Sequence, residues 1–115
     1  MIRKPSNMRV ETKEKMRGGM GTVTIVHLFE KEEFGSKTRL CAKLILPPGA
    51  SIGEHQHDGE DEVYIVTKGS GLLYDGSSES RVSVGDAILT GKGQSHSVRN
   101  DSAESLEIVA LITCY

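Results

Sequence analysis

The sequence predicts an all-β protein, a sandwich or barrel of short strands. Runs of β-branched and aliphatic residues recur along the chain, turns rich in Gly, Asp and Ser separate them, and no apolar pattern of helical period persists. The 115 residues suffice for one domain and are too few for two. We therefore expect a single domain over residues 1–115, with an N-terminal arm over 1–21 and the barrel over 22–115.

The N-terminal arm is polar, and residues 11–17 could form a helical turn or two. Residues 17–21 contain three glycines, and because no helix follows them we interpret the stretch as a flexible approach to the first strand. That strand is predicted over residues 22–29, which are rich in β-branched side chains. A charged loop over 31–37 leads to the next.

The second predicted strand, residues 40–46, alternates in a way typical of a half-buried strand. It places Leu40, Ala42, Leu44 and Leu46 on one face and Lys43 on the other. Further strands are predicted over residues 62–68, 71–74, 81–84, 87–90, 95–100 and 106–115. Turn residues fill the gaps at 47–49, 68–71, 75–78, 84–86, 90–93 and 100–103.

Composition and charge argue against several classes of protein. The formal net charge is −2, and no run of like charges suggests a nucleic-acid or membrane partner. No apolar stretch follows the first residues, so we expect no signal peptide and a cytoplasmic location. Cys41 and Cys114 lie in apolar stretches and are interpreted as buried thiols rather than a disulfide.

Two histidines and an acidic cluster indicate a metal site. On an extended strand His55 and His57 point to the same face, because side chains two apart do so. After a turn, three acids compete for the role of carboxylate ligand: Glu60, Asp61 and Glu62. Strand parity does not choose among them, since both faces of the following strand are apolar.

A third histidine can complete the set. The predicted strand over 95–100 places His96, Val98 and Asn100 on one face. The remaining histidine, His27, is interpreted as a core or edge residue. Neutral imidazoles with a carboxylate suit Zn, Fe, Mn, Co, Ni or Cu.

These residues stand at spacings that resemble the two motifs of the cupin family. The first motif, a glycine, a His-x-His pair, a glutamate and a second glycine, is matched in full by Gly49, His55, His57, Glu62 and Gly69. The second motif is matched by Gly85, Gly93, His96 and Asn100, with Gly91 where the family has proline. The two motifs and the stretch between them span residues 49–100.

The resemblance implies a cupin jelly-roll barrel, also called a double-stranded β-helix. It implies one divalent transition metal (Zn, Mn, Fe, Ni or Cu) bound by His55, His57, Glu62 and His96, which selects Glu62 from the acidic cluster. It also implies a structural, hydrogen-bonded Asn100. The change to Gly91 is expected to loosen the turn before His96.

Cupins that look like this chain include metal-dependent decarboxylases, dioxygenases and isomerases that act on small oxygen-rich molecules such as carboxylates or sugars. Within this group, the chain also resembles small oxalate-decarboxylase-like cupins. The alternative is a non-catalytic barrel that binds a small ligand through its metal. In either case a small-molecule ligand and a homodimer are expected.

Pocket residues can be proposed from strand parity. Tyr64 and Val66 share the face of Glu62, whereas Lys43 is either a pocket cation or an outward-facing one. An oxalate-type reaction needs an inward arginine. Of the nearby arginines, Arg99 has the wrong parity to share a face with His96, and the pattern does not place Arg39 or Arg81.

Overall fold

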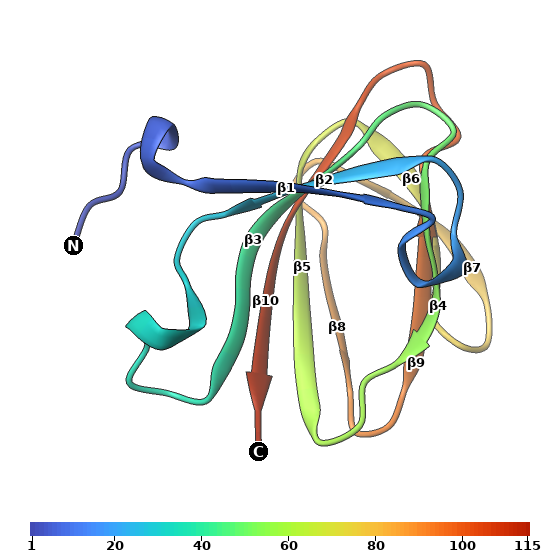
Figure 1. Cartoon of the computed structure of the whole chain (residues 1–115). Coiled ribbons are helices and arrows are strands. Elements are labelled where there is room, and N and C mark those ends of the chain that lie inside the picture. The colour runs from blue at the N-terminus through green and yellow to red at the C-terminus, as the bar shows by residue number, and fades with distance from the viewer.

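The computed structural model describes residues 1–115 as ten antiparallel β-strands in two sheets that face each other (Figure 1). The six-stranded sheet, in the order β1-β2-β3-β10-β5-β8, contains β1 (Arg9–Glu14), β2 (Thr22–His27), β3 (Thr38–Leu46), β10 (Leu106–Cys114), β5 (Glu60–Lys68) and β8 (Ala87–Gly91). The four-stranded sheet, in the order β4-β9-β6-β7, contains β4 (Ser51–Gln56), β9 (Ser95–Arg99), β6 (Ser70–Tyr74) and β7 (Glu79–Ser83).

From β3 onward the chain alternates between the two sheets. Strands β3, β5, β8 and β10 lie in the larger sheet, and β4, the β6–β7 hairpin and β9 lie in the smaller one. This winding is the double-stranded β-helix, or jelly-roll barrel, so the predicted fold class is confirmed. It brings β4 and β9 side by side although they are distant in sequence.

The core fills the space between the sheets. In β3 the predicted alternation is confirmed, because Ala42, Leu44 and Leu46 are buried. The same alternation in β5 buries Glu62, Tyr64 and Val66 on one face. The fifteen buried apolar residues of the core are Val23, Ile25, Ala42, Leu44, Leu46, Ala50, Ile52, Tyr64, Val66, Leu73, Val82, Val98, Leu106, Ile108 and Ala110.

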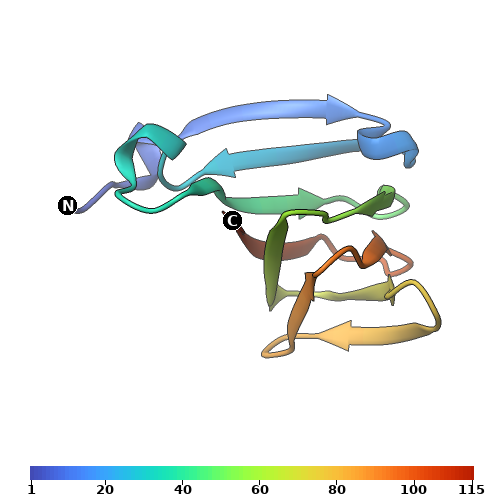
Figure 2. The same ribbon diagram turned by 90° about the horizontal axis from the view of Figure 1, so that it is seen from below.

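The N-terminal segment is more ordered than the sequence predicted. Residues 9–14 form β1, which pairs with β2 and places Glu11 opposite Ile25. The helical turn expected over 11–17 is wrong: β1 is followed by a short 3-10 turn, η2 (Met16–Gly18). Figure 2 shows the β1–β2 hairpin extending the larger sheet beyond β3.

Two further short elements lie near the N-terminus, η1 (Pro5–Asn7) and η3 (Lys31–Glu33), the latter inside the predicted charged loop. Cys41 and Cys114 are free thiols, as expected, but both are partly exposed rather than buried. None of the helical segments has the length and apolar character that a membrane crossing requires.

Candidate metal centre

Four side chains meet inside the barrel. His55 comes from β4, His57 follows that strand, Glu62 lies on β5 and His96 on β9. One possible ligand atom from each lies within 4.8 Å of the others. His57, Glu62 and His96 are almost fully buried, and His55 is partly exposed. The structure therefore brings together the four residues that the cupin resemblance implied.

The distances inside this cluster are short. The Nε2 atom of His96 lies 3.0 Å from Nε2 of His55 and 3.0 Å from Nε2 of His57. The Oε1 atom of Glu62 lies 2.9 Å from Nε2 of His57 and 3.0 Å from Nε2 of His96. One nitrogen of each imidazole thus faces the same small volume as the carboxylate.

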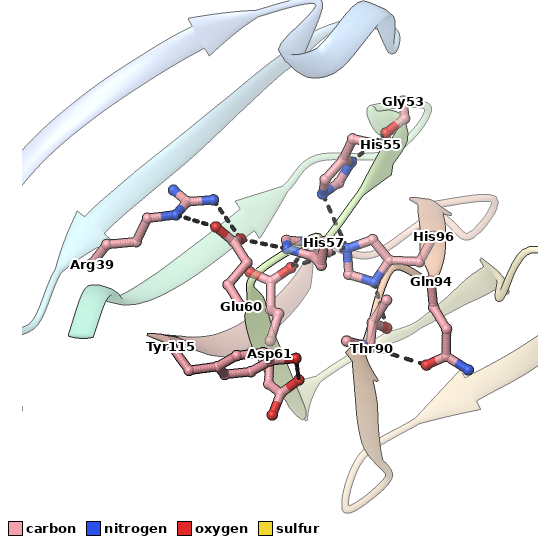
Figure 3. A network of polar contacts seen from close by, with 12 residues as sticks. Arg39, Gly53, His55, His57, Glu60, Asp61, Thr90, Gln94, His96 and Tyr115 are labelled. Atoms are coloured by element: carbon pink, nitrogen blue, oxygen red, sulfur yellow. Dashed lines mark hydrogen bonds and ion pairs between the residues drawn. The ribbon is translucent and has the colours of Figure 1, made fainter. Parts of the chain in front are cut away.

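The opposite nitrogen of each ring, Nδ1, has its own partner (Figure 3). His55 Nδ1 donates to the carbonyl oxygen of Gly53 at 2.7 Å. His57 Nδ1 donates to Oε2 of Glu60 at 2.6 Å, and His96 Nδ1 lies 2.9 Å from the hydroxyl of Thr90, which can accept. Partners of this kind fix the tautomer and orientation of metal-binding histidines.

This arrangement leaves three Nε2 lone pairs and a carboxylate oxygen directed at one another. Where the proton of a ring lies at Nδ1, its Nε2 presents a lone pair, so the 3.0 Å Nε2 contacts bring hydrogen-bond acceptors together. Oε1 of Glu62 is buried and has no hydrogen-bond donor. A cation among these atoms would satisfy all four, so the donor set fits a divalent metal.

The ionisation of Glu60 and His55 is also consistent with a metal site. Arg39 donates two hydrogen bonds to Glu60, at 2.9 and 2.8 Å, and together with His57 it lowers the pKa of Glu60 to about 2. Glu60 is therefore an anion that accepts from His57. Burial lowers the pKa of His55, which keeps this imidazole neutral and able to bind a metal.

The acidic cluster divides into three roles. Glu62 points into the cluster, and Glu60 holds His57 from outside it. Asp61 faces the other way and accepts a hydrogen bond of 3.1 Å from the hydroxyl of Tyr115. The alternation of β5 separates Asp61 from its two neighbours.

The segment before His96 is hydrogen-bonded to the backbone at His57. Gly91 ends β8, and a Cβ at this position would lie 1.8 Å from Oδ1 of Asp61, so the Asp61 side chain would have to move. The peptide N–H of Gly93 donates to the carbonyl of His57, and that of His57 donates to the carbonyl of Gln94, both at 2.9 Å. These two bonds tie the turn before His96 to the backbone of His57.

A cavity of about 190 Å³ adjoins the cluster. Tyr64 lines it and stacks on His96 with ring centroids 4.9 Å apart. Burial, and next the charge of Glu62, raise the pKa of Tyr64, so its hydroxyl stays protonated. The cavity residues are Glu11, Lys13, Met16, Arg17, Ile25, Arg39, Leu40, Leu44, His55, His57, Glu62, Tyr64 and Ile112.

The other two pocket candidates do not line this cavity. Val66 belongs to the apolar core two residues beyond Tyr64. Lys43 lies on the outer face of β3, where its Nζ is 3.4 Å from Oε1 of Glu107. The outward alternative for Lys43 is the one that the structure contains.

Three charged cavity residues were not singled out from the sequence: Glu11, Lys13 and Arg17. All belong to the N-terminal segment that was expected to be an arm. Glu11 and Lys13 are two residues apart, so they would share one face if this polar stretch were a strand. That spacing was the available signal, but it indicates a strand only if a partner strand is assumed. For Arg17 the signal was the three glycines over residues 18–21, which were interpreted as a flexible approach; in the structure, Gly19 lies against β4.

Comparisons with known proteins agree with the barrel fold. Residues 42–112 match the family model described as the cupin domain. A protein of Thermotoga maritima named "Oxalate-binding protein" is 39% identical over 112 residues, which are 97% of this chain and 93% of the relative.

Solved structures give the same result. A crystal structure from Thermotoga maritima, described as "a predicted oxalate decarboxylase", superposes with a TM-score of 0.95 at 38% identity over 100% of both chains. A protein of Thermus thermophilus has a TM-score of 0.71 at 26% identity, over 80% of this chain and 83% of its own. The polyketide cyclase of Streptomyces resistomycificus shares the fold, with a TM-score of 0.78 at 17% identity over 100% of this chain and 81% of its own.

Fold and site together define a β-barrel with a possible His/Glu metal site. The chain belongs to the cupin family, because the family model covers more than half of it and the matched region contains all four clustered residues.

Proposed function

We propose that the protein binds one divalent transition metal through His55, His57, Glu62 and His96, and that this centre binds a small carboxylate anion such as oxalate. One observation carries the metal: the Nε2 atoms of three histidines, whose Nδ1 atoms each have a partner of their own, face the orphaned Oε1 of Glu62. When bound, such an ion supplies Lewis acidity toward a coordinated carboxylate.

The charge of the centre supports an anionic ligand. Three neutral imidazoles, one carboxylate and a divalent cation sum to one positive charge. Lys13 and Arg17 line the same cavity and add to that charge. The name of the Thermotoga maritima relative, an oxalate-binding protein, favours oxalate as the first anion to test.

Binding without turnover is the function that the site supports best. Release of carbon dioxide from oxalate leaves a carbanion that needs a proton, and Glu11 is a cavity carboxylate that could deliver one. However, Glu11 lies 2.7 Å from Nε2 of His27, and this contact lowers the pKa of Glu11. Glu11 is therefore ionised at neutral pH and poorly suited to donate.

A catalytic role is the second candidate, because the Thermotoga maritima structure is described as a predicted oxalate decarboxylase. Incubation of metal-loaded protein with oxalate separates the two functions. Formate and carbon dioxide would establish turnover, whereas a heat of binding without product would establish a binding protein.

The metal itself is tested by elemental analysis of protein purified without added metal. We expect about one transition-metal ion per chain, and we expect His96→Gln to remove it because the remaining ligands complete the shell poorly. His27→Gln is the matched control, since His27 lies outside the cluster. A wild-type protein that holds no metal, and takes up none on dialysis against Mn, Fe, Co, Ni, Cu or Zn, would refute the proposal.

We also propose a homodimer, formed through the outer face of the larger sheet. Five apolar side chains adjoin one another there: Val63 and Ile65 on β5, Leu89 on β8, and Val109 and Leu111 on β10. Leu89 is 69% exposed and Ile65 is 44% exposed, which is costly for side chains of this size. Sedimentation should show a dimer that Leu89→Asp dissociates.

Val84→Asp is the control for the dimer, because Val84 is 62% exposed and lies outside this face. A wild-type monomer at micromolar concentration, or dissociation by both variants alike, would count against the interface.

A further inference from the structure

We infer that Arg17 binds the far end of the anion held at the metal centre, and that the loop over residues 15–21 is built to hold Arg17 there. The inference rests on the proposed function and adds a ligand class: anions with two carboxylates, one for the metal and one for the guanidinium. It assigns this role to a residue outside the segment that matches the cupin domain.

The charged groups of the cavity differ in whether they are already paired. Arg39 donates two hydrogen bonds to Glu60, and Glu11 lies 2.7 Å from His27. Glu62 belongs to the metal cluster. Arg17 and Lys13 have no ion pair or hydrogen bond to another side chain, so they are the two cations free to bind an anion.

Of these two cations, Arg17 is better suited to a carboxylate. A guanidinium presents two parallel N–H donors that match the two oxygens of a carboxylate, whereas an ammonium acts as a point charge. Lys13 lies on the edge strand β1 and adds attraction of longer range.

The backbone that holds Arg17 is strained. Arg17 has φ 54° and Lys15 has φ 50°, both in the left-handed region that non-glycine residues rarely adopt. Such residues persist only where the surrounding structure determines them, and they concentrate at functional sites. Here the surrounding structure is β4.

Two glycines, Gly19 and Gly53, allow the backbone of the loop over residues 15–21 to pack directly against the backbone of β4. A Cβ at Gly53 would lie 2.1 Å from the carbonyl oxygen of Arg17, and a Cβ at Gly19 would lie 2.2 Å from that of Ser51. The peptide N–H of Met20 also donates to the hydroxyl of Ser51 at 2.8 Å. Only glycine permits this approach.

The same contact reaches the metal centre. Gly53 touches the backbone of Arg17, and its carbonyl accepts the hydrogen bond that orients His55. The loop and His55 are therefore both held by one residue of β4, which fixes the backbone of Arg17 relative to the cluster. The Arg17 side chain itself is exposed, and its guanidinium is therefore free to turn toward an anion at the cluster.

The test uses metal-loaded full-length protein and calorimetric titration with oxalate and with acetate, which has one carboxylate. We expect Arg17→Gln to weaken oxalate binding about tenfold or more, the usual effect of losing a charge-assisted pair, and to leave acetate binding within about twofold. Arg17→Lys should fall between the wild type and Arg17→Gln. Metal content should remain that of the wild type in both variants.

Lys15→Gln is the matched control, because Lys15 shares the loop, the positive charge and the left-handed backbone but does not line the cavity. We expect it to bind oxalate as the wild type does. Equal oxalate affinity in Arg17→Gln and Lys15→Gln would overturn the role of Arg17, and so would loss of metal from Arg17→Gln. A wild-type protein that binds metal but neither anion would instead refute the proposed function, and this inference with it.

Discussion

The Nδ1 atom of His57 donates a hydrogen bond of 2.6 Å to the carboxylate of Glu60, which Arg39 holds from its other side. The hydrogen-bonded series Arg39–Glu60–His57 therefore ends on a buried imidazole of the His/Glu cluster. A carboxylate behind a ligating imidazole raises the basicity of that ligand and fixes its tautomer.

Glu60→Gln should therefore weaken metal binding by about 10- to 100-fold, the usual effect of removing such a partner. Competition with a metal-binding dye measures the change. Glu54→Gln is the control, because Glu54 is exposed on β4 beside the site and lies outside the cluster. If both variants bind metal as the wild type does, the contact of Glu60 with His57 does not contribute to affinity.

Gly53→Ala should destabilise the metal-free protein by about 1–3 kcal/mol, the usual cost of an overpacked site. The added methyl would lie 2.1 Å from the carbonyl oxygen of Arg17, a backbone atom that cannot rotate away. Urea unfolding measures the difference. Gly35→Ala provides the comparison, since nothing lies within 4 Å of its Cβ position. Equal stability of the two variants would show that the loop over 15–21 is not fixed by β4.

Asn100→Ala should lower the free energy of unfolding by about 2–4 kcal/mol, because buried backbone groups lose their partners. The Asn100 amide donates to the carbonyls of Leu46 and Glu104 at 2.8 and 2.7 Å, and its oxygen accepts from the peptide N–H of Ser102 at 2.9 Å. Asn7→Ala, at an exposed position, should change stability little. A loss below about 0.5 kcal/mol for Asn100→Ala would contradict this structural role.

The pair of Arg3 and Glu33 predicts a pH dependence. Arg3 donates to Glu33 at 2.6 Å, and this bond, followed by one from the peptide N–H of Glu30, lowers the pKa of Glu33 from 4.5 to about 2. Because the folded state holds the carboxylate ionised, its stabilisation is present above pH 4.5 and is lost as the pH falls toward 2. The wild type should therefore be more stable than Glu33→Gln at pH 7.

Thermal unfolding of the wild type and Glu33→Gln between pH 7 and pH 2 measures the difference in their stability. This difference should become smaller below pH 4.5. Glu32→Gln controls for removal of an acid from the same turn, and its stability should differ less from that of the wild type. A stability difference between the wild type and Glu33→Gln that stays constant down to pH 2 would contradict a stabilising pair of Arg3 and Glu33.

Much of the barrel could be predicted because its strands carry a local signal. Residues 40–46 alternate between the core and the outer face, and glycine turns mark the ends of β5 and β8. Strand β1 has no such signal, since its side chains are mostly exposed on both faces and its pairing with β2 forms it. The sequence alone therefore describes it as a polar arm.

The His/Glu cluster could be predicted from the sequence, whereas the charged residues of the cavity could not. His55, His57, Glu62 and His96 stand at motif spacings, so their convergence could be expected from the resemblance. The position of Arg17 depends on a loop that folds back on Gly53, far away in the sequence. No local sequence pattern predicts this contact. Gly19 and Gly53 permit it only by lacking a side chain, and a missing side chain does not indicate which backbone segment will pack there.

The two parts of the cavity have separate origins along the chain. The cupin match over residues 42–112 contains the four clustered residues, whereas the free cations come from the β1 hairpin and its loop before residue 42. If Arg17 binds the anion as we infer, substitutions in that hairpin should change which anion is preferred while His55, His57, Glu62 and His96 stay in place. The ligand preference of this barrel would then be set by a segment that lies outside the shared cupin core.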